Sequence, residues 1–268
     1  GRSKDDRLFL VRVYGDRNPG EYFLFDTQTG RARFLLAQRS WLKPEQLAQM
    51  QPVSFESRDG LALHGYLTLP PGREAKGLPL VLMPHGGPHG VRDRWGFDPE
   101  VQLLASRGYA VLQLNFRGSA GYGSRFRTAG YGQWGDAMVR DLLDGLNWAV
   151  GQGIADRNRV CAYGASYGAF AALQAAALAP DALRCTAGYV GVYSIPLMFD
   201  VGDTSKSDLG RKFLARVMPE GPDARRQQSP AFNAARIKAP VLLAHGKMDV
   251  RAPIDHFELM RDELAKAG

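Results

Sequence analysis

A short glycine-flanked turn at residues 164–168 constrains the fold of this chain more than any other feature. These residues read Gly-Ala-Ser-Tyr-Gly, the pattern G-x-S-x-G. The apolar run 160–163 precedes the pattern, and the alanine-rich run 169–179 follows it. A serine in a tight turn between a buried strand and a helix needs small neighbours, because the backbone there is strained. The pattern therefore predicts that the hydroxyl of Ser166 projects clear of the end of a strand.

Strand-like and helix-like segments alternate from about residue 53 onward. The runs 53–57 and 61–69 flank the turn Asp59-Gly60, which predicts an antiparallel hairpin. Further short apolar runs are typical of buried strands and lie at 79–84, 109–114, 159–165, 185–192 and 240–244. Helices are expected at 100–107, 134–151, 167–179 and 254–266. This alternation predicts an α/β fold, with a mostly parallel sheet covered by helices on both faces.

The first 50 residues follow a different pattern. The β-rich runs 8–13 and 21–25 are separated by a turn rich in Gly, Asn and Pro, and a third run follows at 33–36. Residues 41–50 are expected to form a short helix or a linker, with Pro44 near its start. We therefore expect a short β segment over residues 1–50 and the α/β domain over residues 51–268.

Composition and charge exclude several classes of protein. Hydrophobic residues make up 45% and charged residues 23%, as in ordinary globular domains. The net charge is +7, but Lys and Arg are interleaved with Asp and Glu, so no nucleic-acid partner is expected. No apolar run approaches the roughly 20 residues that span a bilayer, so no membrane partner is expected either. The cellular compartment stays open, because the chain begins with Gly1 and shows no signal-peptide pattern.

The chain has two cysteines, and both lie in apolar strand-like runs. In such runs a cysteine is most often a small buried hydrophobe, and this is the reading we favour for Cys161 and Cys185. A disulfide between them is the alternative.

Ser166 is the predicted nucleophile, and a serine in this role needs donors for the oxyanion that forms when it attacks an acyl carbon. The sequence His85-Gly86-Gly87-Pro88 follows the strand-like run 79–84, where a backbone N–H donor is expected. The backbone N–H groups of Gly87 and Tyr167 are therefore the predicted oxyanion pair. The alternative for the two glycines is a plain turn. His85 is expected to order this loop, because the base of such a site comes last in the chain.

Asp249 is the predicted acid of a catalytic triad, since it follows the late strand-like run 240–244. The alternative is a helix cap near Pro253. His256 follows Asp249 but falls in the first turns of the closing helix, so we expect a solvated helix residue rather than the base. Arg117 and Tyr122 could line the rim of the active site or anchor a loop, and anchoring is favoured for a guanidinium with several donors.

Several motifs occur together in one order along nearly the whole chain. They are Asp59-Gly60 with His64-Gly65-Tyr66-Leu67, His85-Gly86-Gly87-Pro88-His89, Asn115-Phe116-Arg117-Gly118-Ser119 with Gly121-Tyr122-Gly123, the 164–168 turn, and His245-Gly246 with Asp249 and Pro253. On these motifs the chain resembles the catalytic domain of the prolyl oligopeptidase family of serine peptidases, in particular its acylaminoacyl-peptidase and dipeptidyl-peptidase branch. One departure is Ala169, where the family usually has Gly, and it should be tolerated.

The resemblance implies an eight-stranded α/β-hydrolase domain paired with an N-terminal β-propeller. Residues 1–50 then correspond to the end of the propeller and the linker. The catalytic histidine of the family lies in a loop beyond the point matched by residue 268. We therefore expect a chain truncated at both ends, without the last strand, the last helix and the base, and nearly inactive by itself. An exposed sheet edge would then favour pairing with another copy of the chain.

The function expected from these features is hydrolysis of peptide bonds in small peptides, through an acyl-enzyme on Ser166. Neither a metal nor an organic cofactor is implied. A carboxylesterase would use the same turn and the same oxyanion loop, so it remains an alternative. A non-catalytic fragment or pseudoenzyme with a binding or assembly role is the second alternative, and the lack of a suitably ordered histidine supports it.

Overall fold

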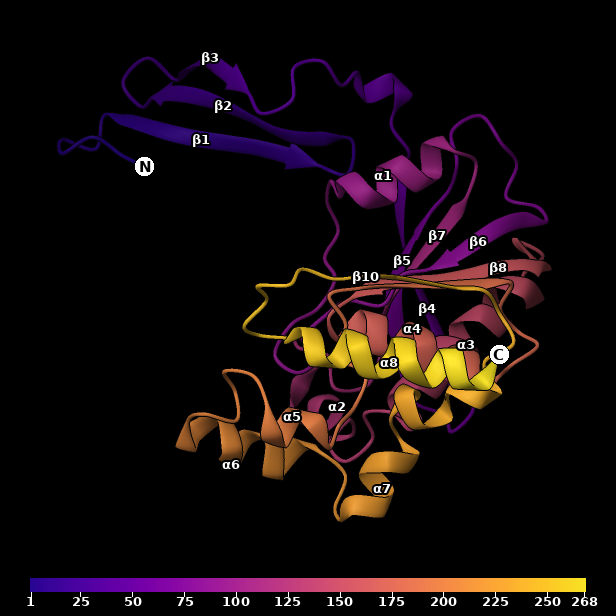
Figure 1. The fold of residues 1–268 in the computed structure, drawn as a ribbon. Helices are drawn as coiled ribbons and strands as arrows, with labels where there is room; N and C mark the ends of the chain where they lie inside the picture. The colour runs from indigo at the N-terminus through magenta and orange to yellow at the C-terminus, as the bar shows by residue number, and fades with distance from the viewer.

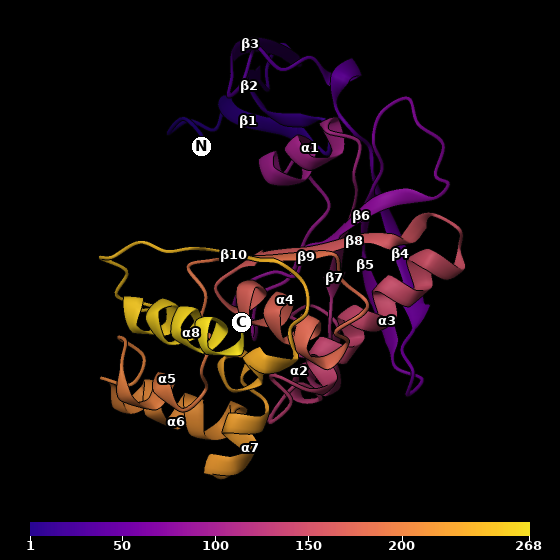
Figure 2. The ribbon, with the colours of Figure 1, turned by 45° about the vertical axis from the view of Figure 1, so that its right-hand side comes forward.

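The computed structural model describes all 268 residues and contains two separate β-sheets (Figure 1). The first sheet is antiparallel and consists of β1 (Leu8–Gly15), β2 (Asn18–Asp26) and β3 (Arg31–Ala37). It stands apart from the second sheet in both ribbon views (Figures 1 and 2). The short β segment expected from the sequence is therefore a sheet of its own.

The second sheet has seven strands in the order β10-β9-β8-β6-β7-β5-β4. Its strands are β4 (Met50–Glu56), β5 (Ala62–Thr68), β6 (Leu78–Leu82), β7 (Ala110–Asn115), β8 (Ala155–Ala165), β9 (Cys185–Tyr189) and β10 (Val241–Ala244). β4 and β5 form the antiparallel hairpin around Asp59-Gly60, and β5 is antiparallel to β7. The other neighbouring pairs are parallel, so the carboxyl ends of β6, β8, β9 and β10 lie along one edge.

Helices cover both faces of the second sheet, as the alternating pattern predicted. They are α1 (Pro99–Ser106), α2 (Gly123–Thr128), α3 (Ala137–Gly151), α4 (Tyr167–Leu178), α5 (Leu197–Asp200), α6 (Asp208–Val217), α7 (Pro222–Gln227) and α8 (Ile254–Ala267). In Figure 2, α3, α4 and α8 lie on one side of the sheet and α1 lies on the side of the first sheet. α4 is buried along almost its whole length, which explains why its sequence is apolar all round. None of the helices combines the length and the apolar character needed to cross a membrane.

Three segments differ from the sequence prediction. Residues 41–50 form only a single 3₁₀ turn at Pro44–Gln46, and Met50 already belongs to β4. The helices α2, α5, α6 and α7 and the 3₁₀ segment Pro230–Arg236 were not predicted. α2, α5 and α7 have six residues or fewer, which is too short for a helical period to show, and α6 was missed although its apolar residues are spaced helically.

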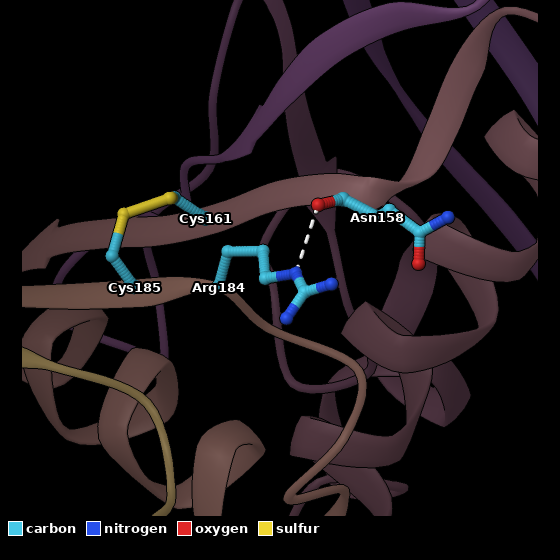
Figure 3. The surroundings of a disulfide bond; sticks show 4 residues. All are labelled: Asn158, Cys161, Arg184 and Cys185. Atoms are coloured by element: carbon cyan, nitrogen blue, oxygen red, sulfur yellow. Dashed lines mark hydrogen bonds between the residues drawn. A yellow bond between two sulfur atoms is a disulfide. The ribbon is translucent and has the colours of Figure 1, made fainter.

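The two cysteines correct the favoured sequence interpretation. Cys161 and Cys185 form a disulfide (Figure 3), and Cys185 is exposed rather than buried. They are register partners on the neighbouring parallel strands β8 and β9, with Cα atoms 4.7 Å apart. That spacing lies in the range of disulfides. Nearby, the Arg184 guanidinium donates to the carbonyl oxygen of Asn158 at 3.0 Å, which adds a second link between these strands.

The first sheet is held against the second by a small polar network. The amide nitrogen of Gln102, on α1, donates to the carbonyl oxygens of Asp16 and Ala48. The Asp16 carboxylate accepts a bond of 2.9 Å from the backbone N–H of Met50. Asp16 and Gln102 are buried, so these bonds form in a dry junction where a polar group must find a partner. The junction therefore fixes the turn between β1 and β2 beside α1.

Candidate active site

Ser166 lies at the carboxyl end of β8 and immediately before α4, in a strained backbone conformation. Its φ is 57° and its ψ is −120°, which non-glycine residues rarely adopt. A Cβ on Gly168 would overlap the carbonyl oxygen of Pro84, and a Cβ on Gly164 would lie 2.5 Å from the Gly168 carbonyl carbon. Both glycines are therefore required by close backbone packing. The predicted strand–turn–helix context of Ser166 is the one that the structure has.

Free backbone donors surround Ser166. The Ser166 hydroxyl makes no hydrogen bond within the protein, and its backbone N–H donates to the carbonyl oxygen of Tyr189 at 3.0 Å. The N–H groups of Tyr167 and Gly87 donate to no protein acceptor. Gly86 lies against the serine, because a Cβ added to it would be 3.6 Å from the Ser166 Cβ. The arrangement thus brings the predicted oxyanion loop to the serine, and the N–H groups of Gly87 and Tyr167 remain without a protein acceptor.

His85 controls the orientation of this loop. Its Nδ1 donates to the carbonyl oxygen of Gly86 at 2.7 Å, and its Nε2 accepts from the Ser119 hydroxyl at 2.8 Å. The ring also stacks on Phe116. The carbonyl of Gly86 and the N–H of Gly87 belong to one planar peptide unit and point in opposite directions. Holding that carbonyl toward His85 therefore directs the Gly87 N–H away from His85. Burial lowers the pKa of His85 to about 4, so the ring is neutral near pH 7.

Asp249 lies in the turn between β10 and α8. Its Oδ1 accepts from the backbone N–H groups of Arg251 and Ala252, at 2.8 and 2.9 Å. The side chain therefore orders its own turn, and it does not cap α8, whose N-cap residue is Pro253. Both hydrogen bonds use Oδ1, which leaves Oδ2 free to accept an imidazole N–H. β10 pairs with β9, and β9 pairs with β8, so this turn lies at the same sheet edge as Ser166.

None of the five histidines hydrogen bonds to Ser166. His85 and His89 lie in the oxyanion loop, where His89 accepts from the Trp134 indole N–H at 3.1 Å. His64 stacks on Tyr122, and His245 donates to the carbonyl oxygen of Ala252. Each ring thus has another structural role.

His256 corrects the sequence interpretation, because it is buried with 1% exposure rather than solvated. Its Nδ1 accepts from the backbone N–H of Tyr193 at 3.2 Å. The reason is the packing of α8, which brings its first turn against the segment that follows β9. His256 therefore ties α8 to that segment.

Arg117 joins three distant parts of the chain. Its guanidinium donates to Asp141 on α3 at 2.7 Å and to Asp59 in the β4–β5 turn at 2.8 Å, and its backbone N–H donates to Asp141 at 2.8 Å. The guanidinium bonds lower the pKa of Asp59 below its usual range. Tyr122 accepts from the Asn115 amide at 3.0 Å. Both residues thus hold loops that follow β7, which is the anchoring geometry.

Two neighbours of the 164–168 turn carried no sequence signal. Val190, directly after β9, has a φ of 44°, which is a strained value for a β-branched residue. Its N–H donates to the carbonyl oxygen of Ala244, so β9 and β10 stay paired beside Ser166. Gly188 leaves room for the buried Tyr193, because a Cβ at Gly188 would overlap the Tyr193 hydroxyl and lie 3.2 Å from the Ala169 Cβ. These relations depend on strand pairing, which local sequence patterns do not reveal.

Comparison with known proteins points to one family. Residues 95–268 match the prolyl oligopeptidase family. The dipeptidyl aminopeptidase BIII of Pseudoxanthomonas mexicana is 34% identical over 277 residues, which cover 99% of this chain and 40% of that protein. The dipeptidyl peptidase family member 6 of Caenorhabditis elegans is 32% identical and covers 93% of the chain. The chain spans 40% and 37% of the lengths of these two relatives.

Solved structures agree with this result. A puromycin-hydrolyzing peptidase of Mycobacterium tuberculosis matches 97% of this chain and 40% of its own, with a TM-score of 0.86 and 27% identity. The acylaminoacyl peptidase of Pyrococcus horikoshii matches 98% of this chain and 42% of its own, with a TM-score of 0.83 and 27% identity. The predicted α/β-hydrolase fold is thereby confirmed.

Proposed function

Because the chain belongs to the prolyl oligopeptidase family, we propose that Ser166 is the nucleophile of a serine peptidase. The observation that carries this proposal is the strained Ser166, with a free hydroxyl beside the two unused N–H donors of Gly87 and Tyr167. A hydroxyl exposed in this way can approach a carbonyl carbon. The donors can then stabilise the negative charge that develops on the carbonyl oxygen.

The proposed reaction proceeds in two steps. Ser166 Oγ attacks the carbonyl carbon of a peptide bond while a base takes its proton, and the amine leaves with a proton to give an acyl-enzyme. Water then attacks the ester, and the acid product and free Ser166 are released. Asp249 would orient the base through its free Oδ2. Since the five histidines have other partners, the base would come from outside residues 1–268, and these residues alone would react slowly.

The substrates we propose are short peptides from which the enzyme removes N-terminal residues. This choice rests on the names of the relatives, a dipeptidyl aminopeptidase and an acylaminoacyl peptidase. We also propose residues 1–50 as the end of an N-terminal β domain with its linker, and residues 51–268 as the hydrolase unit. The two separate sheets support this division.

We further propose that residues 1–268, taken alone, self-associate through the free edge of β10. β10 is the last strand of its sheet, so one side of its backbone has no neighbouring strand. Leu242 on this strand is 68% exposed. An unpaired and apolar edge favours pairing with a second copy.

A fluorophosphonate tests the proposed nucleophile, because it reacts covalently only with an activated serine. We expect intact-mass analysis of the protein carrying its full natural sequence to show a single adduct on Ser166. Ser166→Ala should abolish the adduct, while Ser124→Ala, on the exposed start of α2, should keep it. Residues 1–268 alone should label much more slowly. A single rapid adduct on residues 1–268 would contradict the proposed external base.

A panel of matched esters and anilides separates peptidase from carboxylesterase. We expect the enzyme to release amines from dipeptidyl or acyl-aminoacyl anilides as well as alcohols from the corresponding esters. Fast ester turnover without any peptide or anilide cleavage would overturn the peptidase assignment. Absence of both activities and of labelling would favour the non-catalytic alternative.

A further inference from the structure

A cavity of about 420 Å³ lies between the first sheet and the loop that continues from the oxyanion loop. Residues of the β1–β2 hairpin form one wall, including Arg12 and Tyr14. The other wall is the segment Arg92–Asp98, which begins five residues after Gly87. Its volume lies within the range of small-molecule sites. A cavity at a junction between two structural units is a common place for such sites.

The side chains that line this cavity carry more positive than negative charge. Arg12, Arg92 and Arg94 all line it, and none of them forms an ion pair with a carboxylate. Two carboxyl groups also lie in its walls. The Asp98 carboxylate accepts from the first N–H groups of α1, and burial raises the pKa of Asp93 to about 7. The carboxyls therefore compensate the arginines only in part.

Two of the arginines are held in place by their neighbours. The Arg92 guanidinium lies over the Tyr122 ring, 5.5 Å from its centroid. Arg12 donates to the carbonyl oxygen of Pro19 at 3.0 Å and lies over Tyr14. A guanidinium held by stacking keeps its remaining N–H donors free, and these match a carboxylate geometrically.

The walls also include aromatic surface. Trp95 is fixed by its indole N–H, which donates to the carbonyl oxygen of Met50 at 3.1 Å, yet it stays 46% exposed. Tyr14 is 61% exposed. Flat aromatic surface beside guanidinium groups suits a ligand with an anionic end and an apolar body.

We propose that this cavity binds the carboxylate of a short peptide, with Arg92 and Arg94 contacting the anion and Trp95 contacting the apolar part. The choice of a peptide rests on the proposed function. The cavity wall Arg92–Asp98 and the oxyanion loop form one continuous segment. A peptide bound in the cavity therefore contacts the same segment of chain that forms part of the predicted active site. Binding itself needs no catalysis.

The test compares two peptides that differ only in their C-terminal group. Calorimetry on the Ser166→Ala protein would measure binding of acetyl-Ala-Phe as the free acid and as the amide. Since a charge-assisted hydrogen bond contributes more than a neutral one, we expect the acid to bind about tenfold more tightly. Arg92→Gln and Arg94→Gln should remove this difference, and Arg92→Lys should retain part of it. Arg31→Gln, an exposed arginine on β3 outside the cavity, is the control.

Three outcomes would overturn the proposal. The first is equal binding of acid and amide, and the second is an unchanged preference in both the Arg92→Gln and Arg94→Gln proteins. The third is displacement of the peptide by inorganic phosphate at an equal concentration, which would indicate a general anion site. A preference for the acid in a protein whose Ser166 never labels would support the cavity and contradict the proposed peptidase.

Discussion

At the scale of single residues, the turn around Ser166 depends on glycines, which have no Cβ atom. Gly168 has no Cβ, and this lets the start of α4 approach the Pro84 carbonyl oxygen. We expect Gly168→Ala to lower the free energy of unfolding by ~1–3 kcal/mol, the usual cost of overpacking. Urea unfolding measures this change. Gly151→Ala, where a Cβ meets no atom within 4 Å, is the matched control and should leave stability nearly unchanged. Equal effects of the two substitutions would contradict the steric argument.

His85 offers a second test at this scale, because its role is to orient the Gly86–Gly87 peptide unit. His85→Phe keeps an aromatic ring against Phe116 but removes both hydrogen bonds. We expect labelling of Ser166 by a fluorophosphonate to slow by about tenfold or more, since losing an oxyanion donor outright costs about 10²–10³. His64→Phe is the control, since its ring stacks on Tyr122 away from the oxyanion loop. Equal labelling rates in the His85→Phe and His64→Phe proteins would contradict this role for His85.

Some residues of the candidate site can be predicted from short sequence motifs, and others cannot. Ser166, Gly87 and Tyr167 follow from short motifs, because a tight turn needs glycines close in sequence. Val190 and His256 do not, because the strain of one and the burial of the other arise from pairing and packing between distant segments. Local patterns therefore predict the nucleophile and its donors, while their support is seen only in three dimensions.

At the scale of elements, β6 and β7 were predictable because each is a short apolar run in a buried layer, whereas β4 and β5 were predicted from the turn at Asp59-Gly60 between them. The predicted run 185–192 ends at Tyr189 in the structure, where Val190 turns out of the strand. α6 shows why the 197–227 region was not predicted. Its mean composition is polar, and only Leu214 and Val217 are buried. Its apolar residues Leu209, Phe213, Leu214 and Val217 do follow a helical period, and Ser207 caps its start, but the helix is short and mostly polar.

The disulfide gives a prediction for the β8–β9 pair. The bond between Cys161 and Cys185 closes a loop that contains Ser166 and all of α4. By loop-closure entropy, a loop of this length stabilises the fold by about 3 kcal/mol. The double substitution Cys161→Ala with Cys185→Ala should therefore lower the free energy of unfolding by about that amount. Thiol titration of the denatured protein before and after reduction is the companion measurement. Two free thiols without reduction would contradict the bond.

At the scale of the whole molecule, the proposed pairing through the free edge of β10 concerns residues 1–268 taken alone. We expect sedimentation velocity to show a dimer whose fraction rises with protein concentration. Leu242→Lys places a charge on the exposed edge and should shift the equilibrium toward monomer. Leu209→Lys changes a residue on α6 that is 81% exposed, away from this edge, and should not. A monomer at all concentrations would contradict pairing through β10.

Acid should destabilise the whole molecule, because His85 and His89 in one loop and His256 on α8 are all held neutral by burial. Burial lowers the pKa of each to about 4 from its ordinary value of 6.5. Between these values the unfolded chain binds protons at the three rings and the folded chain does not, so stability is lost as the pH falls through this range. Asp93 opposes the effect, since its pKa is raised to about 7 and its folded form takes up a proton. The net difference of two protons gives a slope of at most ~2.7 kcal/mol per pH unit.

Urea unfolding at pH 7.5 and pH 5 measures this loss, and one substitution isolates a single histidine. His256→Asn keeps an acceptor for the Tyr193 N–H but cannot take up a proton. The loss of stability between the two pH values should therefore shrink by the contribution of one ring, up to about 2 kcal/mol. Arg31→Gln removes a charge on the exposed face of β3 and should leave the pH dependence unchanged. If His256→Asn loses as much stability as the parent protein, the buried ring does not cause the acid sensitivity, because its protonation was the only term removed.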